Sequence, residues 1–462
     1  MTIIATSPFY QAGALVAAGA TPLNYSADVE ADLVRRGVAA YSGANPERGG
    51  AVPAFTVTDA NNNSVLVDPE SGGALMVKPG RSVATRILSA AVATVTNQLG
   101  NTFSLGAKLA DKFDAVRLIY LNNCATQTVG MACAFSTAAD MSSNLNSAGT
   151  WVTGTMADAA ARTSAIDPSW NYSSWVELNG DSQVVYARLY IPSAGNTENT
   201  INNFTLSAPT TTSPSLQTGD EWITAKEAGN FAASNFTGFT TTGKTDWSPI
   251  VGIQYRARGL VHTVVGVGDS ITFGTKTTYP ADAFWVKAVR ALKLAGFKVE
   301  SCNLGVSGQT TASYFARAQT ALTQLAPSVM IYSPFSPNDT SGLPTDAGTT
   351  TERNYLAQMR ELAKSAGTLL VPFTGIPKCT TDESTSIWTV AQNNFRQSVN
   401  NVARALPYHI DLDAQVATTT ATGTAPGVQT GYMATDLLHL SETGNKAAKE
   451  HAKSVIKRAI SF

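Results

Sequence analysis

The sequence predicts an α/β domain with a parallel sheet between helices, preceded by a β-rich domain of the sandwich or jelly-roll type. From Leu260 to Phe462, short apolar runs alternate with segments of helical spacing, which is the pattern of a parallel sheet with helices on both faces. From about residue 80 to 259, short β-branched runs are separated by Gly, Asn, Ser and Thr, as in antiparallel sheets. A chain of 462 residues is also long enough for two or three domains.

Residues 1–79 are predicted to form a small N-terminal segment with a helix and a hairpin. Ser26 is a candidate cap for a helix from Ala27 to about Ala40, because acidic residues occupy its first turn. Two β-prone runs flank Asn61-Asn62-Asn63 and predict a hairpin over 53–67. This segment weakly resembles the attachment regions of bacteriophage tail proteins, although a peripheral subdomain is the simpler interpretation.

Residues 80–259 predict the β-sandwich, with its clearest strands at 114–121, 129–135, 183–191 and 250–255. Tryptophans in or near its loops have two interpretations. Exposed rings could stack on sugar rings and give a carbohydrate-binding or attachment domain, whereas buried rings would close the ends of the sandwich. The five residues are Trp151, Trp170, Trp175, Trp222 and Trp247.

Residues 260–462 are predicted to form the α/β domain. Strands are expected at 264–267, 298–303, 328–332, 368–372 and 407–412, and helices over 282–295, 311–325, 351–366, 390–406 and 443–460. Gly296 and Gly367 are expected to end two of these helices. Two polar stretches, 341–350 and 418–430, are expected to be loops beside the site, and neither contains an apolar segment long enough for a lid.

A candidate nucleophile follows the first strand of this domain. Gly268-Asp269-Ser270 comes directly after the apolar run Val264–Val267, and ligands bind open α/β sheets at the carboxyl ends of their strands. A serine hydroxyl needs a base that is itself oriented by a third group. Ser270 is therefore a candidate nucleophile if a histidine can reach it.

The chain has only four histidines, and one of them lies three residues after an aspartate. His262 precedes the strand and is expected in a connecting segment, His409 lies in a predicted strand, and His451 lies on the polar face of the last helix. In Asp436-Leu437-Leu438-His439, the carboxylate could bind imidazole Nδ1 and leave Nε2 for the serine. His439 is the candidate base and Asp436 its orienting partner.

Together, the motifs in residues 262–462 resemble those of the SGNH hydrolases, the GDSL esterase family, in the family's order. Gly268-Asp269-Ser270 matches the first block, and Asn303–Thr310 resembles the second. Asn338-Asp339 matches the end of the third, Gly-x-Asn-Asp, while the segment from Asp436 to His439 matches the last. The resemblance implies a flavodoxin-like sheet and a Ser-His-Asp triad.

The resemblance also implies an oxyanion hole, made by the backbone N–H groups of Ser270 and Gly308 and by the side chain of Asn338. Such donors usually supply the largest catalytic contribution in acyl transfer. The third block departs from the family pattern, because Ser336 replaces its glycine and Pro337 contributes no N–H. This departure is expected to change the acyl pocket more than the mechanism.

The expected activity is hydrolysis of short acyl esters, most plausibly O-acetyl groups on a carbohydrate such as an acetylated polysaccharide. One alternative is a general lipase or polyester hydrolase. Another is a phage tail or adhesion protein whose hydrolase domain serves receptor binding. Because the base must be neutral to accept the serine proton, activity should fall at acid pH as His439 becomes protonated.

Composition limits the partners and the location. With 14% charged residues and a net charge of −1, the chain lacks the basic excess that nucleic acid requires, and no apolar stretch is long enough for a membrane span. No Lys or Arg precedes the apolar stretch 12–18, so there is no evident signal peptide, although an extracellular or virion-associated location is expected. Four cysteines are expected as buried thiols, without metal or cofactor. The sequence does not decide whether the chain forms a homo-oligomer.

Overall fold

The computed structural model describes most of the chain after residue 250 and a smaller share before it. The described residues are 81–87, 99–120, 131–138, 171–181, 183–193, 222–230, 250–277, 282–339, 346–379, 383, 387–418 and 427–461, with short strands at 3–5, 9–11, 14–16, 39–41, 55–58, 64–68, 73–75, 94–95, 153–154, 201–202 and 240–241.

Four strands form the predicted parallel sheet. Their order is β23 (Leu369–Pro372), β22 (Val329–Tyr332), β20 (Ile250–Val267) and β21 (Val299–Asn303). The C-terminal half of β20 pairs in parallel with β21 on one side and with β22 on the other. The chain therefore leaves β20 at the point where the strand order reverses, which is where open α/β sheets bind ligands.

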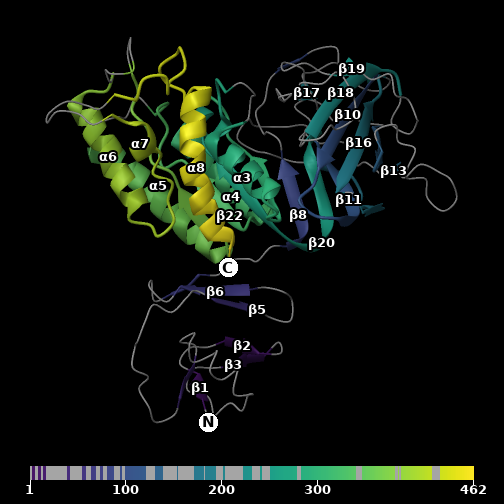
Figure 1. The fold of residues 1–462 in the computed structure, drawn as a ribbon, viewed down its shortest axis with the longest axis horizontal. Coiled ribbons are helices and arrows are strands. Elements are labelled where there is room, and N and C mark those ends of the chain that lie inside the picture. The colour runs from purple at the N-terminus through teal and green to yellow at the C-terminus, as the bar shows by residue number, and fades with distance from the viewer. Residues whose placement is uncertain are drawn as a thin grey trace.

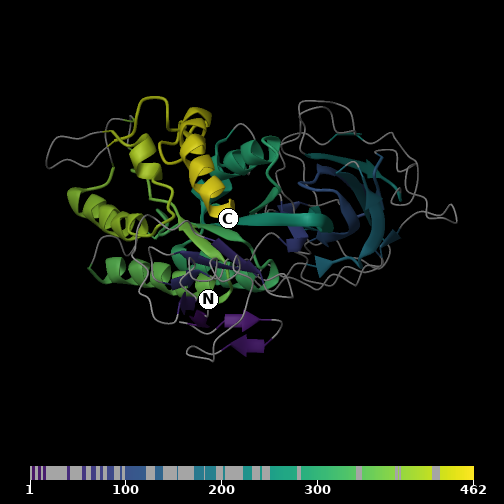
Figure 2. The same ribbon diagram turned by 60° about the horizontal axis from the view of Figure 1, so that its bottom comes forward.

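Helices cover both faces of this sheet, as the layers in Figures 1 and 2 show. One face packs against α3 (Phe284–Leu294) and α8 (Glu442–Ile460), and the other packs against α4 (Thr311–Gln324) and α5 (Asp346–Ser365). Helix α6 (Val390–Arg404) contacts α5, and two short helices, α2 (Ser270–Phe273) and α7 (Leu412–Val416), complete the described set. The arrangement is the flavodoxin-like one that the sequence predicts.

The strand residues alternate between the two faces and so create two cores. Val264, Val329 and Val371 pack with α3 and α8 in one buried cluster. Val265 and Met330, one position along, pack with α4 and α5 in the other. Successive strand side chains point to opposite faces, so strands covered on both sides are apolar at nearly every position.

The helix ends follow the expected chemistry. Gly296, with φ of 89°, ends α3, and Gly367, with φ of 65°, ends α5, because glycine adopts the left-handed conformation without steric cost. Thr389 and Gln392 form a reciprocal capping box at the start of α6, and the side chain of Ser441 caps α8. These local signals explain why the boundaries of most helices could be predicted closely.

In the β-rich part, two antiparallel layers enclose a common core (Figure 1). One layer has the order β13 (Thr153–Gly154), β12 (Ala132–Ser136), β16 (Val184–Ile191), β10 (Asn101–Lys108), β18 (Trp222–Ala228) and β19 (Thr240–Thr241). The other contains β8 (Arg81–Ile87), β11 (Phe113–Tyr120), β14 (Asn171–Tyr172), β15 (Val176–Gly180) and the first half of β20. This arrangement is compatible with the predicted sandwich.

The remaining described strands form small sheets of two or three strands. They are β1 (Ile3–Ala5) with β4 (Ala39–Tyr41), β2 (Phe9–Gln11) with β3 (Ala14–Val16), β5 (Phe55–Thr58) with β6 (Ser64–Asp68) and β7 (Gly73–Leu75), and β9 (Thr94–Val95) with β17 (Ile201–Asn202). The antiparallel pairing of β5 with β6 confirms the predicted hairpin.

Strand β20 runs without interruption from the β-rich part into the parallel sheet. Its first half pairs antiparallel with β11 and β8, and its register with β8 shifts between Arg256 and Val261. The prediction of two separate strands, 250–255 and 264–267, with His262 in a connecting segment, is therefore wrong. The predicted boundary between residues 259 and 260 falls inside this strand.

Surface ion pairs explain why the continuity of β20 could not be predicted from the sequence. Arg256 pairs with Glu177 at 3.1 Å, and Arg258 pairs with Asp114 and Asp181, each at 2.7 Å. The apolar run is interrupted where the strand is exposed on one side, and alternating exposure at these positions does not end a strand.

Three smaller predictions also need correction. Residues 407–412 do not form a strand, because Ile410 makes only an isolated bridge with Phe373 before Asp411 caps α7. Helix α5 begins at Asp346, so much of the loop predicted at 341–350 is helical. The predicted helix over 27–40 lies mostly outside the described residues, and Ala39–Tyr41 form β4 instead.

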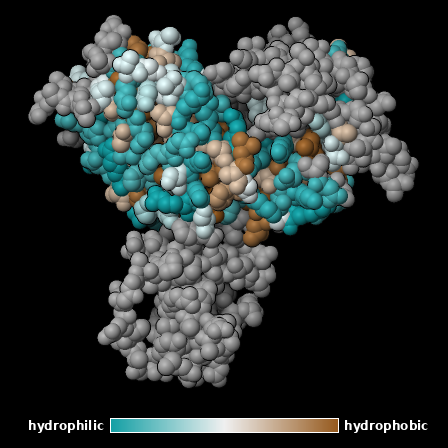
Figure 3. All heavy atoms as spheres, viewed as in Figure 1, coloured by the Kyte–Doolittle hydropathy of each residue, from teal (hydrophilic) through white to brown (hydrophobic). Residues whose placement is uncertain are grey.

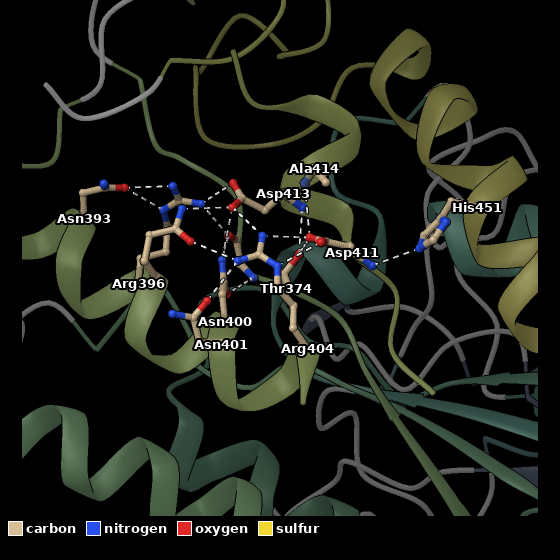
Figure 4. Close-up of polar contacts among 12 residues, drawn as sticks. Thr374, Asn393, Arg396, Asn400, Asn401, Arg404, Asp411, Asp413, Ala414 and His451 are labelled. Atoms are coloured by element: carbon tan, nitrogen blue, oxygen red, sulfur yellow. Dashed lines mark hydrogen bonds and ion pairs between the residues drawn. The ribbon is translucent and has the colours of Figure 1, made fainter. Parts of the chain in front are cut away.

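Buried polar contacts hold the loop that follows β23 (Figure 4). Arg396 of α6 pairs with Asp413 and donates from Nη1 to the carbonyl of Gly375 at 2.9 Å. Asn400 binds both backbone groups of the same glycine, at 2.7 and 2.9 Å. Since buried charges are tolerated only when they are paired and hydrogen-bonded, this network fixes α6 and the start of α7 against the sheet edge.

The visible face of the helical part is mostly hydrophilic, and hydrophobic residues gather where it meets the β-rich part (Figure 3). Within the described part of the chain, no helix has the length and apolarity needed to cross a membrane. The three described cysteines, Cys133, Cys302 and Cys379, are buried as expected, whereas Cys124 lies outside the described residues.

The two described tryptophans of the β-rich part contact the protein itself. The guanidinium groups of Arg117 and Arg256 each lie 4.7 Å from the Trp175 ring, and Trp222 packs against two hydrophobic cores. Trp151, Trp170 and Trp247 lie outside the described residues. Contact of this part with a glycan stays a prediction.

Candidate active site

The candidate nucleophile lies on a tight turn at the carboxyl end of β20. Asp269 caps α2 by accepting a hydrogen bond from Ile271 N at 2.9 Å, and Ser270 is the first residue of that helix. Ser270 is 4% exposed and Asp269 fully buried. The turn thus places the serine at the sheet edge with its backbone N–H at a helix N-terminus, where negative charge is favoured.

Trp285 supports this turn from below. Its indole Nε1 donates to the carbonyl of Thr272 at 2.9 Å. A Cβ added to Gly266, in β20, would lie 2.2 Å from the Trp285 ring. Gly266 therefore leaves space for the large, fully buried Trp285 ring. The ring in turn supports the nucleophile turn through its hydrogen bond to Thr272.

The candidate base and its partner form a hydrogen-bonded pair. His439 Nδ1 lies 2.8 Å from Asp436 Oδ2, and the backbone N–H groups of Leu438 and His439 donate to Asp436 Oδ1 at 3.2 and 3.1 Å. Partial burial raises the pKa of Asp436, but the bonds from the imidazole and from these N–H groups outweigh it and hold the pKa below its usual value. An ionised carboxylate on Nδ1 fixes the tautomer that leaves Nε2 unprotonated.

The other ring nitrogen of His439 is available as an acceptor. His439 is 9% exposed, and its Nε2 atom is buried without a hydrogen-bond partner among the described residues. The imidazole also lies close enough to Asp269 for its charge to lower the pKa of that carboxyl, although burial has the larger, opposite effect and raises it overall. The base thus interacts electrostatically with the residue that caps the helix carrying Ser270.

A strained turn presents this pair. Leu437, between the two residues, has a φ of 53°, a conformation that leucine rarely adopts. Backbone bonds hold the segment in place, from Ala434 N to His439 O at 2.8 Å and from Cys379 N to Leu437 O at 3.0 Å. The loop that follows β23 thus supports the base directly.

The second block places Gly308 near the same edge, after β21. Its φ is 78°, and a Cβ added there would meet no heavy atom within 4 Å. The backbone conformation therefore favours glycine, and the space beside it is open. Asn303, at the end of β21, fixes the start of this loop by accepting from Gly305 N and donating to Phe273 O, each at 3.0 Å.

The third block places Asn338 after β22. Its amide Nδ2 donates to the carbonyl of Gln309 at 3.1 Å and to Ser336 Oγ at 3.0 Å. The neighbouring Asp339 accepts hydrogen bonds from the N–H groups of Thr311 and Ser336. The amide is held by the protein, so it can serve an oxyanion only by exchanging one of these contacts.

The rim beside Ser270 is polar. The hydroxyls of Thr275 and Ser307 lie 2.7 Å apart at the surface. Lys276, a left-handed residue with φ of 67°, brings its Nζ to 4.0 Å from Asp436 Oδ2. The exposed surroundings of the site therefore offer hydroxyl and ammonium groups.

All five predicted site residues lie in the described part. Ser270 begins α2 directly after β20, and the other four lie on segments that follow β21 and β22 or that precede α8. Their roles in catalysis stay predictions. Three supporting residues were missed: Ser336, Trp285 and Lys276. Only Ser336 carried a sequence signal, as a departure from the third block, whereas the positions of Trp285 and Lys276 depend on tertiary contacts.

Comparison with protein families agrees with this arrangement. Residues 267–447 match the model of the GDSL-like Lipase/Acylhydrolase family. This part of the chain is a GDSL-like acylhydrolase domain, and the fold is that of the SGNH hydrolases. No curated protein matches this sequence.

Several solved structures are similar to part of this chain. A lipolytic protein of the G-D-S-L family from Desulfitobacterium hafniense has 18% identity and a TM-score of 0.33, covering 42% of this chain and 98% of that one. A family 3 carbohydrate esterase from Clostridium thermocellum has 17% identity and a TM-score of 0.33, covering 44% and 98%. An acetylxylan esterase from Geobacillus stearothermophilus has 15% identity and a TM-score of 0.32, covering 44% and 94%.

Proposed function

We propose that the acylhydrolase domain is a serine esterase that removes short acyl groups, in particular O-acetyl groups, from a carbohydrate. The observation that carries the esterase proposal is the Asp436–His439 pair, in which Nδ1 is bound at 2.8 Å and Nε2 is buried without a partner. A neutral imidazole held in this tautomer is what a serine nucleophile requires.

In the proposed reaction, Ser270 Oγ attacks the ester carbonyl while His439 Nε2 takes the hydroxyl proton. Asp436 stabilises the imidazolium that forms. His439 then returns the proton to the leaving alcohol, and the acyl group remains on Ser270. A water molecule, deprotonated by the same imidazole, attacks the acyl-enzyme and releases the acid and the free serine.

Three hydrogen-bond donors are proposed to stabilise the negative charge that develops on the carbonyl oxygen. They are the N–H of Ser270, the N–H of Gly308 and the side-chain amide of Asn338. The first lies at the N-terminus of α2. The second belongs to an open glycine turn. Loss of one such donor typically costs on the order of 100-fold to 1,000-fold in kcat.

The preference for a small acyl group on a polar alcohol is supported by the rim of the site. Thr275, Ser307 and Lys276 offer polar groups beside the nucleophile turn. A sugar presents hydroxyls that can exchange hydrogen bonds with such groups, whereas a long acyl chain needs extended apolar surface. Residues 340–345 and 419–426, in or beside the stretches expected to be loops, lie outside the described residues.

Initial rates on aryl esters of increasing acyl length, together with acetate release from O-acetylated polysaccharides, test the proposal in the wild type and in Ser270→Ala. Fast acetate release that disappears in the variant supports it. A preference for long acyl chains would favour the lipase alternative. Hydrolysis by neither protein would leave the receptor-binding alternative, in which the domain binds without catalysis.

A further inference from the structure

Ser336 occupies the position where the third block of the family pattern has glycine, and its hydroxyl is surrounded by groups of the site. It is fully buried. Ser336 Oγ lies 2.7 Å from Asp269 Oδ2 and 2.8 Å from the carbonyl of Gln309. It also accepts from the backbone N of Asn338 at 3.2 Å and from its amide Nδ2 at 3.0 Å.

The capacity of a hydroxyl group shows how these contacts are shared. A serine hydroxyl has one hydrogen to donate and two lone pairs to accept with. The two donors of Asn338 occupy both lone pairs, so the hydrogen is left for Asp269 or for the Gln309 carbonyl. The ionised carboxylate at 2.7 Å is the stronger acceptor. The Ser336 hydroxyl is thus saturated by Asp269 and Asn338.

Asp269 depends on this hydroxyl. One carboxylate oxygen, Oδ1, is bound by Ile271 N, and the other, Oδ2, by Ser336 Oγ. Burial raises the pKa of Asp269, and the bond from Ser336 is the largest of the effects that oppose it. Without the hydroxyl, a buried carboxylate oxygen would lose its donor, in the residue that caps the helix carrying Ser270.

Asn338 depends on it too. Both hydrogens of the Asn338 amide are engaged, by Gln309 O and by Ser336 Oγ. The contact with Ser336 joins two neutral groups, and hydrogen bonds to an ionised acceptor are roughly twice as strong. An oxyanion that forms nearby can therefore draw this hydrogen away from Ser336, while the bond to Gln309 keeps the amide in place.

From this arrangement we infer that Ser336 is a positioning residue for the esterase reaction. Its hydroxyl joins the nucleophile turn, through Asp269, to the oxyanion loop, through Asn338, and releases the amide when charge develops on the substrate. The inference rests on the proposed function for its effect on rate. The hydrogen bond to Asp269 can be tested independently of it.

The first test compares Ser336→Ala with Ser333→Ala. Ser333 is a matched control, because its buried hydroxyl lies in the same segment and donates its hydrogen to Phe335 O at 2.9 Å, not to Asp269. With p-nitrophenyl acetate, we expect Ser336→Ala to lower kcat on the order of 10-fold to 100-fold with little change in KM, because misplacing catalytic groups costs rate at this scale. Ser333→Ala should lose thermal stability alone. Equal effects of the two variants on kcat would overturn the inference.

A double-mutant cycle with Asn338→Ala tests the coupling. If Ser336 acts partly through the Asn338 amide, Ser336→Ala should cost distinctly less rate in the Asn338→Ala background than in the wild type, because coupled residues are not additive. Costs that multiply independently would contradict the proposed link and leave Ser336 with a structural role.

A third measurement needs no turnover. NMR of the protein labelled with ¹³C at aspartate carboxyls, with Asp269→Asn to assign the signal, follows the titration of Asp269. In Ser336→Ala its midpoint should rise by about one pH unit or more, since a hydrogen bond to the charged form is lost. An unchanged midpoint would refute the bond to Asp269. If the wild type hydrolysed no ester, the proposed function would fail while this titration still decided the contact.

Discussion

His439 Nδ1 lies 2.8 Å from Asp436 Oδ2, and the carboxylate also accepts the backbone N–H of the same histidine at 3.1 Å. Two bonds from one residue to one side chain leave the imidazole little freedom to rotate. Because Nε2, the second ring nitrogen, is buried and without a partner among the described residues, the imidazole can accept a proton only at Nε2. This relationship generates the first prediction.

Asp436→Asn should reduce kcat on the order of 10,000-fold while the fold is retained. The asparagine amide can stabilise the wrong imidazole tautomer, and it lacks the charge that favours imidazolium. Steady-state kinetics on a short-chain aryl ester would measure the loss. Glu442→Gln is a suitable control, because Glu442 pairs with Lys287 at 2.8 Å in the adjacent helix. A similar loss in both variants would argue against a specific role for Asp436.

Gly308→Ala should lower stability by about 1–2 kcal/mol and also slow hydrolysis by at least about tenfold. At φ of 78°, an alanine is strained although it meets no atom within 4 Å, and a shift of the N–H would weaken the oxyanion hole. Gly296→Ala is matched, since Gly296 has φ of 89° and equally open space at the end of α3. It should show the loss of stability without the loss of rate. If it slowed hydrolysis equally, strain alone would explain both.

Hydrolysis should slow as the pH falls into the acid range. His439 must be unprotonated at Nε2 to accept the serine proton, so protonation of the imidazole removes the base. The pH dependence of kcat/KM for an aryl ester would show an acid limb governed by one group. A rate that stays constant as the pH is lowered through the acid range would contradict the assignment of His439 as base.

Stability should also decline at acid pH through His262, which lies within β20. Burial lowers the pKa of His262 to about 4 from an ordinary value of 6.5, so the unfolded chain binds a proton there that the folded chain excludes. Stability is then complete above pH 6.5 and is lost as the pH falls towards 4, by at most about 3 kcal/mol. Urea unfolding at pH 7 and pH 5 would show the difference. His262→Gln should remove much of this difference in unfolding free energy. If the variant kept the same pH dependence, groups other than His262 would be responsible for it.

Gly266→Ala should destabilise the domain by roughly 1–3 kcal/mol or more, because overpacking a rigid core forces its neighbours to move. The added Cβ would lie 2.2 Å from the Trp285 ring. Since Trp285 holds the carbonyl of Thr272, esterase activity should fall as well. Gly266→Ala combined with Trp285→Phe should recover part of the stability. Thermal unfolding that matched the wild type would contradict the predicted clash.

Much of the acylhydrolase domain could be predicted from the sequence because its local signals agree with its tertiary structure. The strands β21, β22 and β23 are short apolar runs covered on both faces, and glycines end α3 and α5. Three motif blocks follow successive parallel strands, so topology alone brings Ser270, Gly308 and Asn338 to one edge.

The sequence was less informative where tertiary contacts override local pattern. Strand β20 continues through Arg256 and Arg258 because acids on neighbouring strands pair with them. Residues 407–412 look like a strand, yet Ile410 bridges only Phe373 before α7 begins. The bond between Ser336 and Asp269 joins residues 67 positions apart, a distance over which no periodicity could indicate contact.

The most direct test of the esterase assignment is mass spectrometry of the intact protein after treatment with a fluorophosphonate, followed by peptide mapping. The phosphonate reacts with a serine only where a base activates it and donors hold the developing charge. We expect one adduct, on Ser270, that is absent from Ser270→Ala and forms far more slowly in His439→Ala. No adduct on the wild type, or an adduct on another residue that persists in Ser270→Ala, would contradict the assignment of Ser270 as the nucleophile.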